Sequence, residues 1–464
     1  MFTLERFRTS VLLAHEHGGS VMRVLAAAFN AVEAGAAVKK YLSENPLSIA
    51  QPRRTFAFGL GKAACAMTAA LADETSLTDT LIITKHASPF NPSTRSGRRF
   101  GPVTVIEGDH PIPGSSSLAA GTVALKFLSQ LTQDDLLVCL ISGGGSALMT
   151  APRIPLADLQ SLTSALLACG ARIDEINILR RHLDGLKGGG LARSAASRGA
   201  RIISLLLSDV VGDSIEAIAS GPTAPDPTTN ADALLIIEKY NLKNKIPTSI
   251  SQSLNETLKP NDPIFDRVQN IVIASNEIAL CAAQVQAQRE GFQTNIIRTE
   301  LQGEASIMGR EIALQLKESL QTLQRPFCLL AGGETTVTLR RSSHCPDTCT
   351  GVRRKCGFSG GQALKGNGKG GRNQEFALAA VDVLAGLKDV MLISLATDGE
   401  DGPTDAAGAV VTGESAHRAE SLGMSVADYL SRNDAYSFFD SLGDLVKTNP
   451  SGTNVNDLVI CFAF

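Results

Sequence analysis

Three glycine-rich segments of the sequence could bind an anion. Residues 56–67 read FAFGLGKAACAM and residues 136–149 read LLVCLISGGGSALM, so in both a strand-like run ends in glycines where a helix-like run begins. Such a turn directs backbone N–H groups and the positive end of a helix toward one point. In residues 177–192, NILRRHLDGLKGGGLA, a lysine precedes three glycines. One segment alone would suit a tight turn, but the three together favour phosphate or carboxylate binding. The candidate binding residues are Gly59, Gly61, Lys62, Ser142, Gly143, Gly144, Gly145, Ser146, Lys187, Gly188 and Gly189.

The turn GLGKAA also fits the dinucleotide fingerprint G-x-G-x-x-A. That fingerprint needs an acidic residue about 20 positions later, where this chain has Thr84, Lys85 and His86. NAD is therefore disfavoured, and NADP remains open only through Lys85. A Walker A loop is excluded because its first glycine is missing and Ala63 follows Lys62.

Acidic residues follow two strand-like runs, in LLLSDVVGD (205–213) and ATDGEDGPTDAAG (396–408). Carboxylates beside phosphate-binding loops suit Mg²⁺, which takes a few hard oxygen ligands. The alternative for each Asp is a helix cap or an Asx turn. An EF-hand is rejected, because the twelfth position from Asp398 is Ala409. The candidate metal ligands are Asp209, Asp213, Asp398 and Asp401.

A third polar cluster lies in GGETTVTL (332–339) and GNGKGGRNQEFALA (366–379). A lysine and an arginine among glycines suit charge neutralisation of a transferred phosphoryl group, although an exposed basic turn has the same composition. A Ser-His-Asp hydrolase is disfavoured, because GGGSA lacks the last glycine of the nucleophile elbow. The candidates here are Glu334, Lys369, Arg372, Asn373 and Glu375.

Between these two motifs, residues 340–366 are polar and rich in glycine and cysteine. His344, Cys345, Cys349 and Cys356 could ligate zinc, but their spacing matches no paired Cys-x-x-Cys module. We expect an inserted surface loop.

The elements that must position these residues alternate between strands and helices. Near-continuous apolar runs at 56–61, 80–85, 103–108, 136–142 and 200–208 predict a parallel sheet covered by helices on both faces. Similar runs at 270–276, 294–298, 327–339, 390–399 and 457–464 predict a second α/β domain. We expect an extension at 1–20, a doubly wound domain at 21–260 and a second α/β domain at 261–464.

Composition limits the partners. The 464 residues are 44% hydrophobic and carry a net charge of −3, which offers no basic field for nucleic acid. No apolar run approaches the roughly 18 residues of a membrane helix. Six of the nine cysteines stand singly among apolar residues, as reduced core thiols do. We therefore expect a cytoplasmic protein with a small-molecule substrate and no nucleic-acid or membrane partner. Organelle targeting by residues 1–20 and a homodimer are left open.

The ordered set of motifs resembles the glycerate 2-kinase family, the class II kinases that end in a MOFRL domain. The resemblance covers residues from about 21 to 464 and rests on GLGKAA, GDHPIP, SGGGSAL, INILRRHLDGLKGGGLA, LSDVVGDSIEAIASGPT, ASNEIAL, GGETTVTL, GKGGRNQE, TDGEDGPTDAAGA and GTNVNDL. It implies ATP, Mg²⁺ and D-glycerate, with 2-phosphoglycerate as the product. It also implies a Rossmann-like α/β/α domain, a mixed α/β domain and an active site in the cleft between them. Lys62 and Arg372 match the family's proposed active-site lysine and arginine.

The sequence departs from the family at residues 1–20 and at the insert 340–366. The glycine and arginine motifs on either side of the insert are intact, so we expect activity to persist. Two other functions remain as alternatives. The first is an NADP-dependent hydroxypyruvate reductase, suggested by GLGKAA and Lys85, and the second is a non-catalytic metabolite-binding protein. The sequence does not determine which Asp binds metal or acts as a base.

Overall fold

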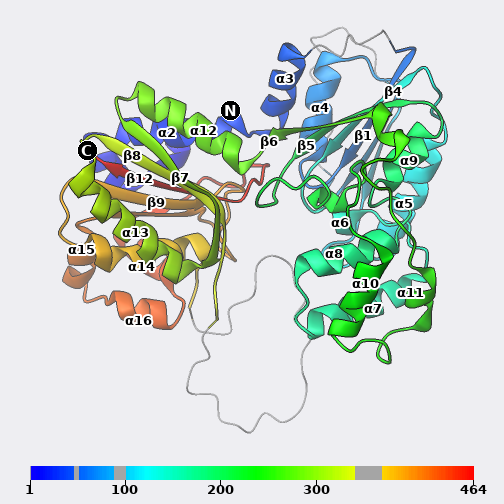
Figure 1. Cartoon of the computed structure of the whole chain (residues 1–464). Helices are drawn as coiled ribbons and strands as arrows, with labels where there is room; N and C mark the ends of the chain where they lie inside the picture. The colour runs from blue at the N-terminus through cyan, green and yellow to red at the C-terminus, as the bar shows by residue number, and fades with distance from the viewer. Residues whose placement is uncertain (1, 46–51, 88–100, 340–367) are drawn as a thin grey trace. The chain divides into compact units, whose positions relative to one another are not determined.

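The computed structural model describes residues 2–45, 52–87, 101–339 and 368–464 (Figure 1). These residues form two compact units. The central unit is Ala34–Ile273, and the terminal unit combines Met1–Glu33 with Ala274–Phe464. The insert expected at 340–366, with its four candidate zinc ligands, lies outside the described residues.

The central unit contains a six-stranded sheet in the order β3-β2-β1-β4-β5-β6. The pairs among β1 to β5 are parallel, as the near-continuous apolar runs predict. The order reverses direction between β1 and β4, which is the switch point of a doubly wound sheet. The strands are β1 (Arg54–Leu60), β2 (Asp79–Thr84), β3 (Val103–Glu107), β4 (Asp135–Ile141), β5 (Arg201–Leu207) and β6 (Val268–Ala274).

Helices cover both faces of this sheet. Phe56, Phe58 and their neighbours on one face pack against α5 (Ser115–Leu128) and α9 (Gly190–Ala196). On the other face Ile82 packs against Ala64 and Cys65 of α4 (Ala64–Glu74), and α3 (Ala34–Glu44) lies beside α4. The unit is therefore a three-layer α/β/α structure, as expected.

Four helices of the central unit form a separate helical cluster (Figure 1). They are α7 (Leu156–Ala168), α8 (Ile173–His182), α10 (Asn230–Lys239) and α11 (Thr248–Ser253). Their apolar faces share a core that includes Leu162, Leu179 and Ile236. The short helix α6 (Gly145–Leu148) is separated from α7 by residues 149–155, which include Pro152 and Pro155, and α8 is separated from α9 by the glycine-rich residues 183–189.

The terminal unit contains a mixed six-stranded sheet in the order β11-β10-β9-β12-β8-β7. β12 lies between β8 and β9 and is antiparallel to both, whereas β7 and β8 are parallel. The strands are β7 (Gln293–Glu304), β8 (Phe327–Thr336), β9 (Val390–Ala396), β10 (Gly408–Thr412), β11 (Leu445–Val446) and β12 (Asp457–Ala463). The sequence analysis missed the two short strands β10 and β11.

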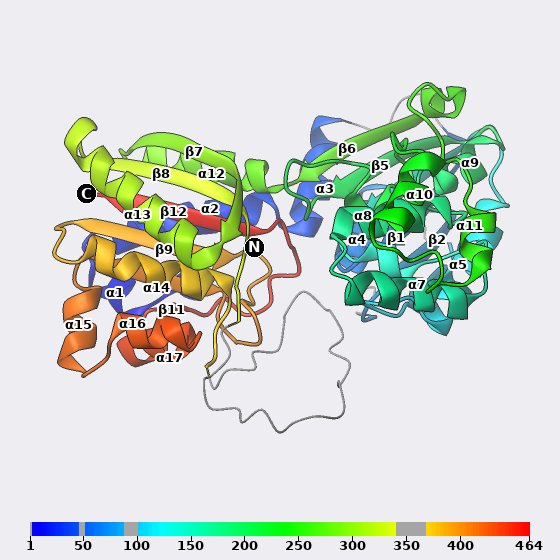
Figure 2. The ribbon, with the colours of Figure 1, turned by 60° about the horizontal axis from the view of Figure 1, so that its bottom comes forward.

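The helices of the terminal unit lie on both faces of its sheet (Figure 2). α13 (Ala305–Thr322) and α14 (Arg372–Leu384) pack on one face, with α15 (Ser415–Ser421), α16 (Val426–Ser431) and α17 (Ala435–Leu442) beyond them. α2 (Gly18–Ala31) packs on α12 (Asn276–Arg289), which contacts β7, β8 and β12.

The N-terminal residues are an integral part of the terminal unit. Phe2, Phe7 and Phe29 form an aromatic cluster, in which the Phe29 centroid is 5.1 Å from each of the other two. Arg23 donates two hydrogen bonds of 2.7 Å to Glu290 of the unit's C-terminal part. The expectation of a separate extension at 1–20 is therefore corrected, because aromatic burial and this ion pair anchor the segment.

The expected boundary near residue 260 also differs from the structure. The strand predicted at 270–276 for the second domain is β6, and it lies beside β5 in the sheet of the central unit. Its apolar composition suits either sheet, so the sequence does not decide which one it joins.

Six cysteines are free among the described residues. Cys65, Cys139, Cys328 and Cys461 are buried, whereas Cys169 and Cys281 are exposed.

In the described part of the chain no single helix is long and apolar enough to cross a membrane. Only α2 and α3 taken together, with a bend of 69° between them, reach that length and composition.

Candidate active site

The first group of candidate residues lies where β1 and β4 of the central unit end. The turns after these two strands hold each other: the amide of Lys62 donates to the carbonyl of Gly143 at 3.0 Å, and the amide of Ala63 donates to Oγ of Ser142 at 3.0 Å. Because the chain order reverses between β1 and β4, this is the position where doubly wound sheets bind ligands.

The glycines of GLGKAA allow close packing against other parts of the protein. Gly61 has a φ of +117°, and a Cβ there would lie 2.4 Å from Ser142. A Cβ at Gly59 would lie 2.7 Å from Oγ1 of Thr68 in α4. Since the first amides before α4 already have protein acceptors, they are not available for a pyrophosphate. This geometry disfavours a dinucleotide at GLGKAA.

The SGGGS turn is the part of this region that remains able to bind an anion. In the described chain the amides of Gly143 and Gly144 donate to no protein acceptor. Gly144 has a φ of +84°, and a Cβ there would lie 3.3 Å from Cγ of Lys62. Gly145 packs against Leu60, and Ser146 shares a hydrogen bond of 2.6 Å with Ser220. The structure thus brings the exposed Lys62 side chain to the predicted glycine turn.

His110, a lone histidine in the sequence, lies in the same region. Burial, together with the positive charges of Lys62, Lys85 and Arg180, lowers its pKa to about 4. The imidazole is therefore neutral at physiological pH. The loop after β3 supplies His110, so the ends of β1, β2, β3 and β4 all contribute to this region.

The KGGG segment is placed differently from its prediction. Lys187 is buried, and its ammonium donates to Asp184 at 2.8 Å and to the carbonyl of Met149 at 2.7 Å. The amides of Gly188 and Gly189 donate to the carbonyls of Ser220 and Gly221. Since every donor of a phosphate-binding loop is used inside the unit, the prediction of Lys187, Gly188 and Gly189 as phosphate ligands is not supported.

Asp209 and Asp213 follow β5. Asp209 lies against Gly143, where a Cβ would be 1.9 Å from its carboxylate. Asp213 has a φ of +51° and closes a turn through its amide to the carbonyl of Val210. Of these two predicted metal ligands, Asp209 is the one that lies against the SGGGS turn.

The second group of candidates lines a cavity of about 260 Å³ in the terminal unit. The glycines before α14, the end of β8 and the turn after β9 form its walls. Among the described residues that line it, the charged ones are predominantly acidic: Glu334, Glu375, Asp398, Glu400 and Asp401 accompany one arginine, Arg372.

Arg372 is held by two carboxylates. Its Nε and Nη2 donate to the two oxygens of Asp457 at 2.6 and 3.0 Å, and its Nη1 donates to Glu334 at 2.8 Å. Burial opposes the charge, but Asp457 and then Glu334 outweigh it and raise the pKa of Arg372 above its usual value. Burial also raises the pKa of Glu334, against the lowering effect of Arg372. Two strands, β8 and β12, together with helix α14 therefore fix the guanidinium plane at the cavity wall.

Asp457 was not among the sequence candidates. It opens β12, the strand between β8 and β9, and only 5% of its side chain is exposed. The signal available in the sequence was the motif GTNVNDL, in which this acid begins a fully apolar strand.

Asp401 and Asn373 have structural contacts. Asp401 is buried and accepts hydrogen bonds from the amides of Asn373 and Gln374 at 3.1 and 2.8 Å. Burial raises its pKa to about 7, although these amides act in the opposite direction. Asn373 also accepts a hydrogen bond from Ser394. The prediction of Asp401 as a metal ligand is therefore corrected: the helix-cap alternative describes its position.

Glu375 and Lys369 lie on either side of this helix start. Glu375 lines the cavity and accepts from the amide of Asn433 at 3.0 and 3.1 Å. The ammonium of Lys369 lies 3.6 Å from the ring centre of Tyr436, a cation–π contact that directs it to the protein surface. Glu375 is thus placed at the site, whereas Lys369 is not among the residues that line the cavity.

The four predicted metal ligands are divided between the two units, and Asp398 and Asp401 share the cavity of the terminal unit. Among the described residues, no group of three His, Cys, Asp or Glu side chains could hold a metal ion. Asp209 and Asp213 belong to the central unit, Asp401 caps α14, and Asp398 lines the cavity of the terminal unit. The described side chains do not fit a preformed Mg²⁺ site.

Comparison with known families gives two matches. A model described as a domain of unknown function, DUF4147, matches residues 20–255, and the MOFRL family model matches residues 356–457.

Several relatives are similar over most of the chain. A glycerate 2-kinase of Pyrococcus horikoshii is 38% identical over 88% of this chain and 87% of its own length. A D-glycerate 2-kinase of Thermotoga maritima is 38% identical over 79% and 82%. A protein of Agrobacterium vitis whose name proposes a hydroxypyruvate reductase is 36% identical over 95% and 94%.

Solved structures agree with these similarities. The crystal structure of a glycerate kinase from Thermotoga maritima matches with a TM-score of 0.82 and 35% identity, over 96% of this chain and 99% of that one. A protein from Pyrococcus horikoshii matches with a TM-score of 0.78 and 36% identity, over 96% and 98%.

Proposed function

The chain belongs to the glycerate 2-kinase family, and we propose that it transfers the γ-phosphoryl group of ATP to the 2-hydroxyl of D-glycerate, giving 2-phospho-D-glycerate. The observation that carries this proposal is the contrast in charge between two sites. One is an acidic cavity around a fixed Arg372, and the other is a glycine turn beside an exposed Lys62.

The acidic cavity suits the nucleotide. ATP enters as its magnesium complex, so the metal is part of the substrate and needs no preformed protein site. Glu334, Asp398 and Glu400 line the cavity and attract a cation-bearing ligand. Arg372 supplies charge-assisted donors to phosphate oxygens, and its two carboxylate partners fix its orientation in advance.

Lys62 suits the transferred phosphoryl group. In phosphoryl transfer the charge on the moving group is stabilised by positioned cations, and the loose transition state demands little of a base. Lys62 lies where the β1 turn crosses the SGGGS turn, and the amides of Gly143 and Gly144 add donors beside it.

The reductase alternative is less well supported. A dinucleotide at GLGKAA would require the amides before α4, and these donate to Gly143 and Ser142. The acidic residue that would bind the ribose is also missing after β2.

We further propose that the enzyme works in the cytoplasm on small molecules, without a nucleic-acid or membrane partner. The near-neutral net charge of −3 and the free thiols support this proposal.

A coupled assay with D-glycerate, ATP and Mg²⁺ tests the function, with NMR identification of the product. We expect 2-phosphoglycerate from the wild type and its loss in Lys62→Ala and Arg372→Ala. A parallel assay with hydroxypyruvate and NADPH tests the alternative. NADPH oxidation without phosphorylation of D-glycerate would overturn the kinase proposal.

A further inference from the structure

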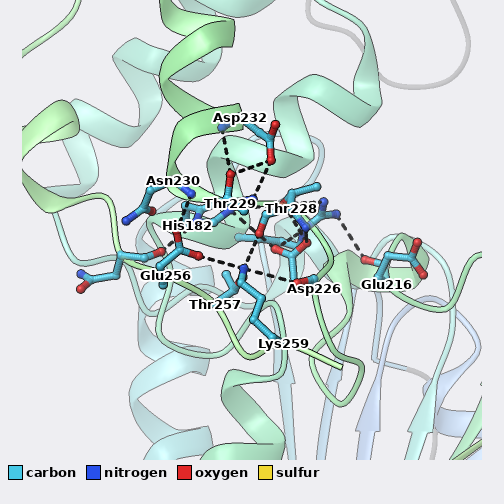
Figure 3. A network of polar contacts seen from close by, with 12 residues as sticks. His182, Glu216, Asp226, Thr228, Thr229, Asn230, Asp232, Glu256, Thr257 and Lys259 are labelled. Atoms are coloured by element: carbon cyan, nitrogen blue, oxygen red, sulfur yellow. Dashed lines mark hydrogen bonds and ion pairs between the residues drawn. The ribbon is translucent and has the colours of Figure 1, made fainter. Parts of the chain in front are cut away.

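The end of α8 presents three consecutive basic residues, Arg180, Arg181 and His182, of which two are fixed inside the protein. Arg181 donates to Asp226 at 2.9 Å, and this pair is almost fully buried. His182 forms hydrogen bonds with Thr228 at 3.2 Å and with the carbonyl of Asn255 at 2.7 Å. Figure 3 shows this network around Asp226, Thr228 and Lys259. It anchors the C-terminal end of α8.

Arg180 has no such partner. Successive residues of a helix point about 100° apart, so the anchoring of Arg181 directs Arg180 to a different side of α8. Its Nε is buried without a hydrogen-bond partner among the described residues, and its Nη1 donates to Oδ1 of Asn177 at the long distance of 3.5 Å. Burial lowers its pKa to about 10, and in the part of the chain that the structure describes no acidic neighbour offsets that effect. A buried guanidinium without an anion is unfavourable.

His110 shows the same deficit. Its Nδ1 is also buried without a hydrogen-bond partner. The charges that act on it are those of Lys62, Lys85 and Arg180. A Cβ on Gly144 would lie 3.3 Å from Lys62 and 3.8 Å from Cδ2 of His110. Lys62 and His110 therefore lie at the SGGGS turn, where Asp209 approaches Gly143, and the charges of Lys85 and Arg180 act on the same imidazole.

We propose that Arg180 and His110, supported by Lys85, bind the carboxylate of the acceptor substrate, and that Lys62 is left for the transferred phosphoryl group. This inference rests on the proposed function. The planar guanidinium matches a carboxylate in a two-bond arrangement. A neutral imidazole donates one further hydrogen bond, and the bound anion satisfies both orphaned nitrogens.

A single small anion suits this position better than the polyphosphate of the nucleotide. Arg180 and His110 are partly buried, which limits the size of the group that reaches them. The magnesium complex of ATP is instead matched by the acidic cavity at Arg372. The substrate class that follows is a short hydroxy acid, whose carboxylate is recognised separately from its reacting hydroxyl.

Steady-state kinetics with both substrates varied test the assignment. We expect Arg180→Gln to raise the KM for D-glycerate about 30-fold, as for loss of a charge-assisted hydrogen bond, with the KM for ATP unchanged. Arg180→Lys keeps the charge but loses the planar pair of donors, so it should raise the KM for D-glycerate by a smaller factor. Arg198→Gln is the matched control, because Arg198 is exposed in the turn after α9, before β5 begins.

A binding measurement separates this inference from the proposed reaction. Calorimetry should show D-glycerate binding to the wild type and weaker binding to Arg180→Gln. NMR titration of His110 should show a higher pKa with D-glycerate than with glycerol, which lacks the carboxylate. Arg180→Gln should melt no lower than the wild type, because it removes an unpaired buried charge.

Two results would overturn the inference. One is a folded Arg180→Gln variant that binds D-glycerate as the wild type does. The other is a loss of ATP affinity with glycerate affinity intact, which would assign the cluster to phosphate. Normal binding of D-glycerate that depends on Arg180, without formation of 2-phosphoglycerate, would instead contradict only the proposed reaction.

Discussion

The two candidate sites differ in whether their basic side chains are paired with protein groups. In the terminal unit Arg372 is fully paired with Asp457 and Glu334 before any ligand binds. In the central unit Lys62, Lys85 and Arg180 crowd around His110, and Arg180 and His110 each keep a buried nitrogen without a partner. Paired charges fix the geometry of a site in advance. Unpaired charges instead store an unfavourable interaction that an anion relieves, so they indicate what the site binds.

The comparison is tested most severely at Lys62. Lys62→Met removes an exposed cation, so we expect kcat to fall about 1,000-fold while the free energy of unfolding changes by less than about 0.5 kcal/mol. Kinetics and urea unfolding measure the two effects. Lys126→Met, on the exposed side of α5, is the control. A variant with near-normal kcat would remove Lys62 from the reaction.

Lys187 should show the reverse behaviour. Lys187→Met leaves the buried Asp184 without its cation, so we expect a loss of about 3 kcal/mol in unfolding free energy. The KM for D-glycerate of the folded fraction should not change. Restoration of stability by the double variant Lys187→Met with Asp184→Asn would support the structural role. A raised KM for D-glycerate at unchanged stability would instead indicate that Lys187 belongs to the substrate site.

His110 provides a smaller effect that depends on pH. Its pKa is about 4 in the folded protein and 6.5 in the unfolded chain, so between these values the unfolded chain binds more protons. Stability therefore decreases as the pH falls from about 6.5 to 4, by about 2 kcal/mol for this residue after allowance for its partial exposure. His110→Gln should reduce this decrease in urea unfolding at pH 7 and pH 4.5. Identical pH dependence in variant and wild type would contradict the assigned pKa.

Much of the fold followed from the sequence because buried parallel strands are apolar on both faces. The predicted runs at 56–61 and 136–142 became β1 and β4, and their glycine turns lie together as the rules for doubly wound sheets require. The sequence did not predict which sheet contains β6, because an apolar strand can pair with the strands of either sheet. The N-terminal segment was misplaced for a similar reason, since the contact that joins this part of the chain to its unit, Arg23 with Glu290, spans most of the sequence.

The site was predictable only where function and local pattern coincide. Lys62 and the SGGGS turn stand at strand ends, so their spacing indicates their role. The KGGG segment has the same local pattern as a phosphate-binding loop, yet its amides donate hydrogen bonds to the carbonyls of Ser220 and Gly221. Asp401 has the sequence context of a metal ligand, but its carboxylate accepts hydrogen bonds from the amides at the start of α14. Arg180 was missed because the sequence cannot show which of two adjacent arginines lacks a partner.

The position of β12 has a consequence for biosynthesis. This strand follows β8 and β9 in the chain, yet it lies between them in the sheet and supplies the Asp457 that holds Arg372. Residues 34–273 contain their own core and can fold while translation continues. The helices of residues 2–33 must wait for α12, and the sheet of the terminal unit must wait for β12. The cavity around Arg372 therefore forms only after β12 has been synthesised.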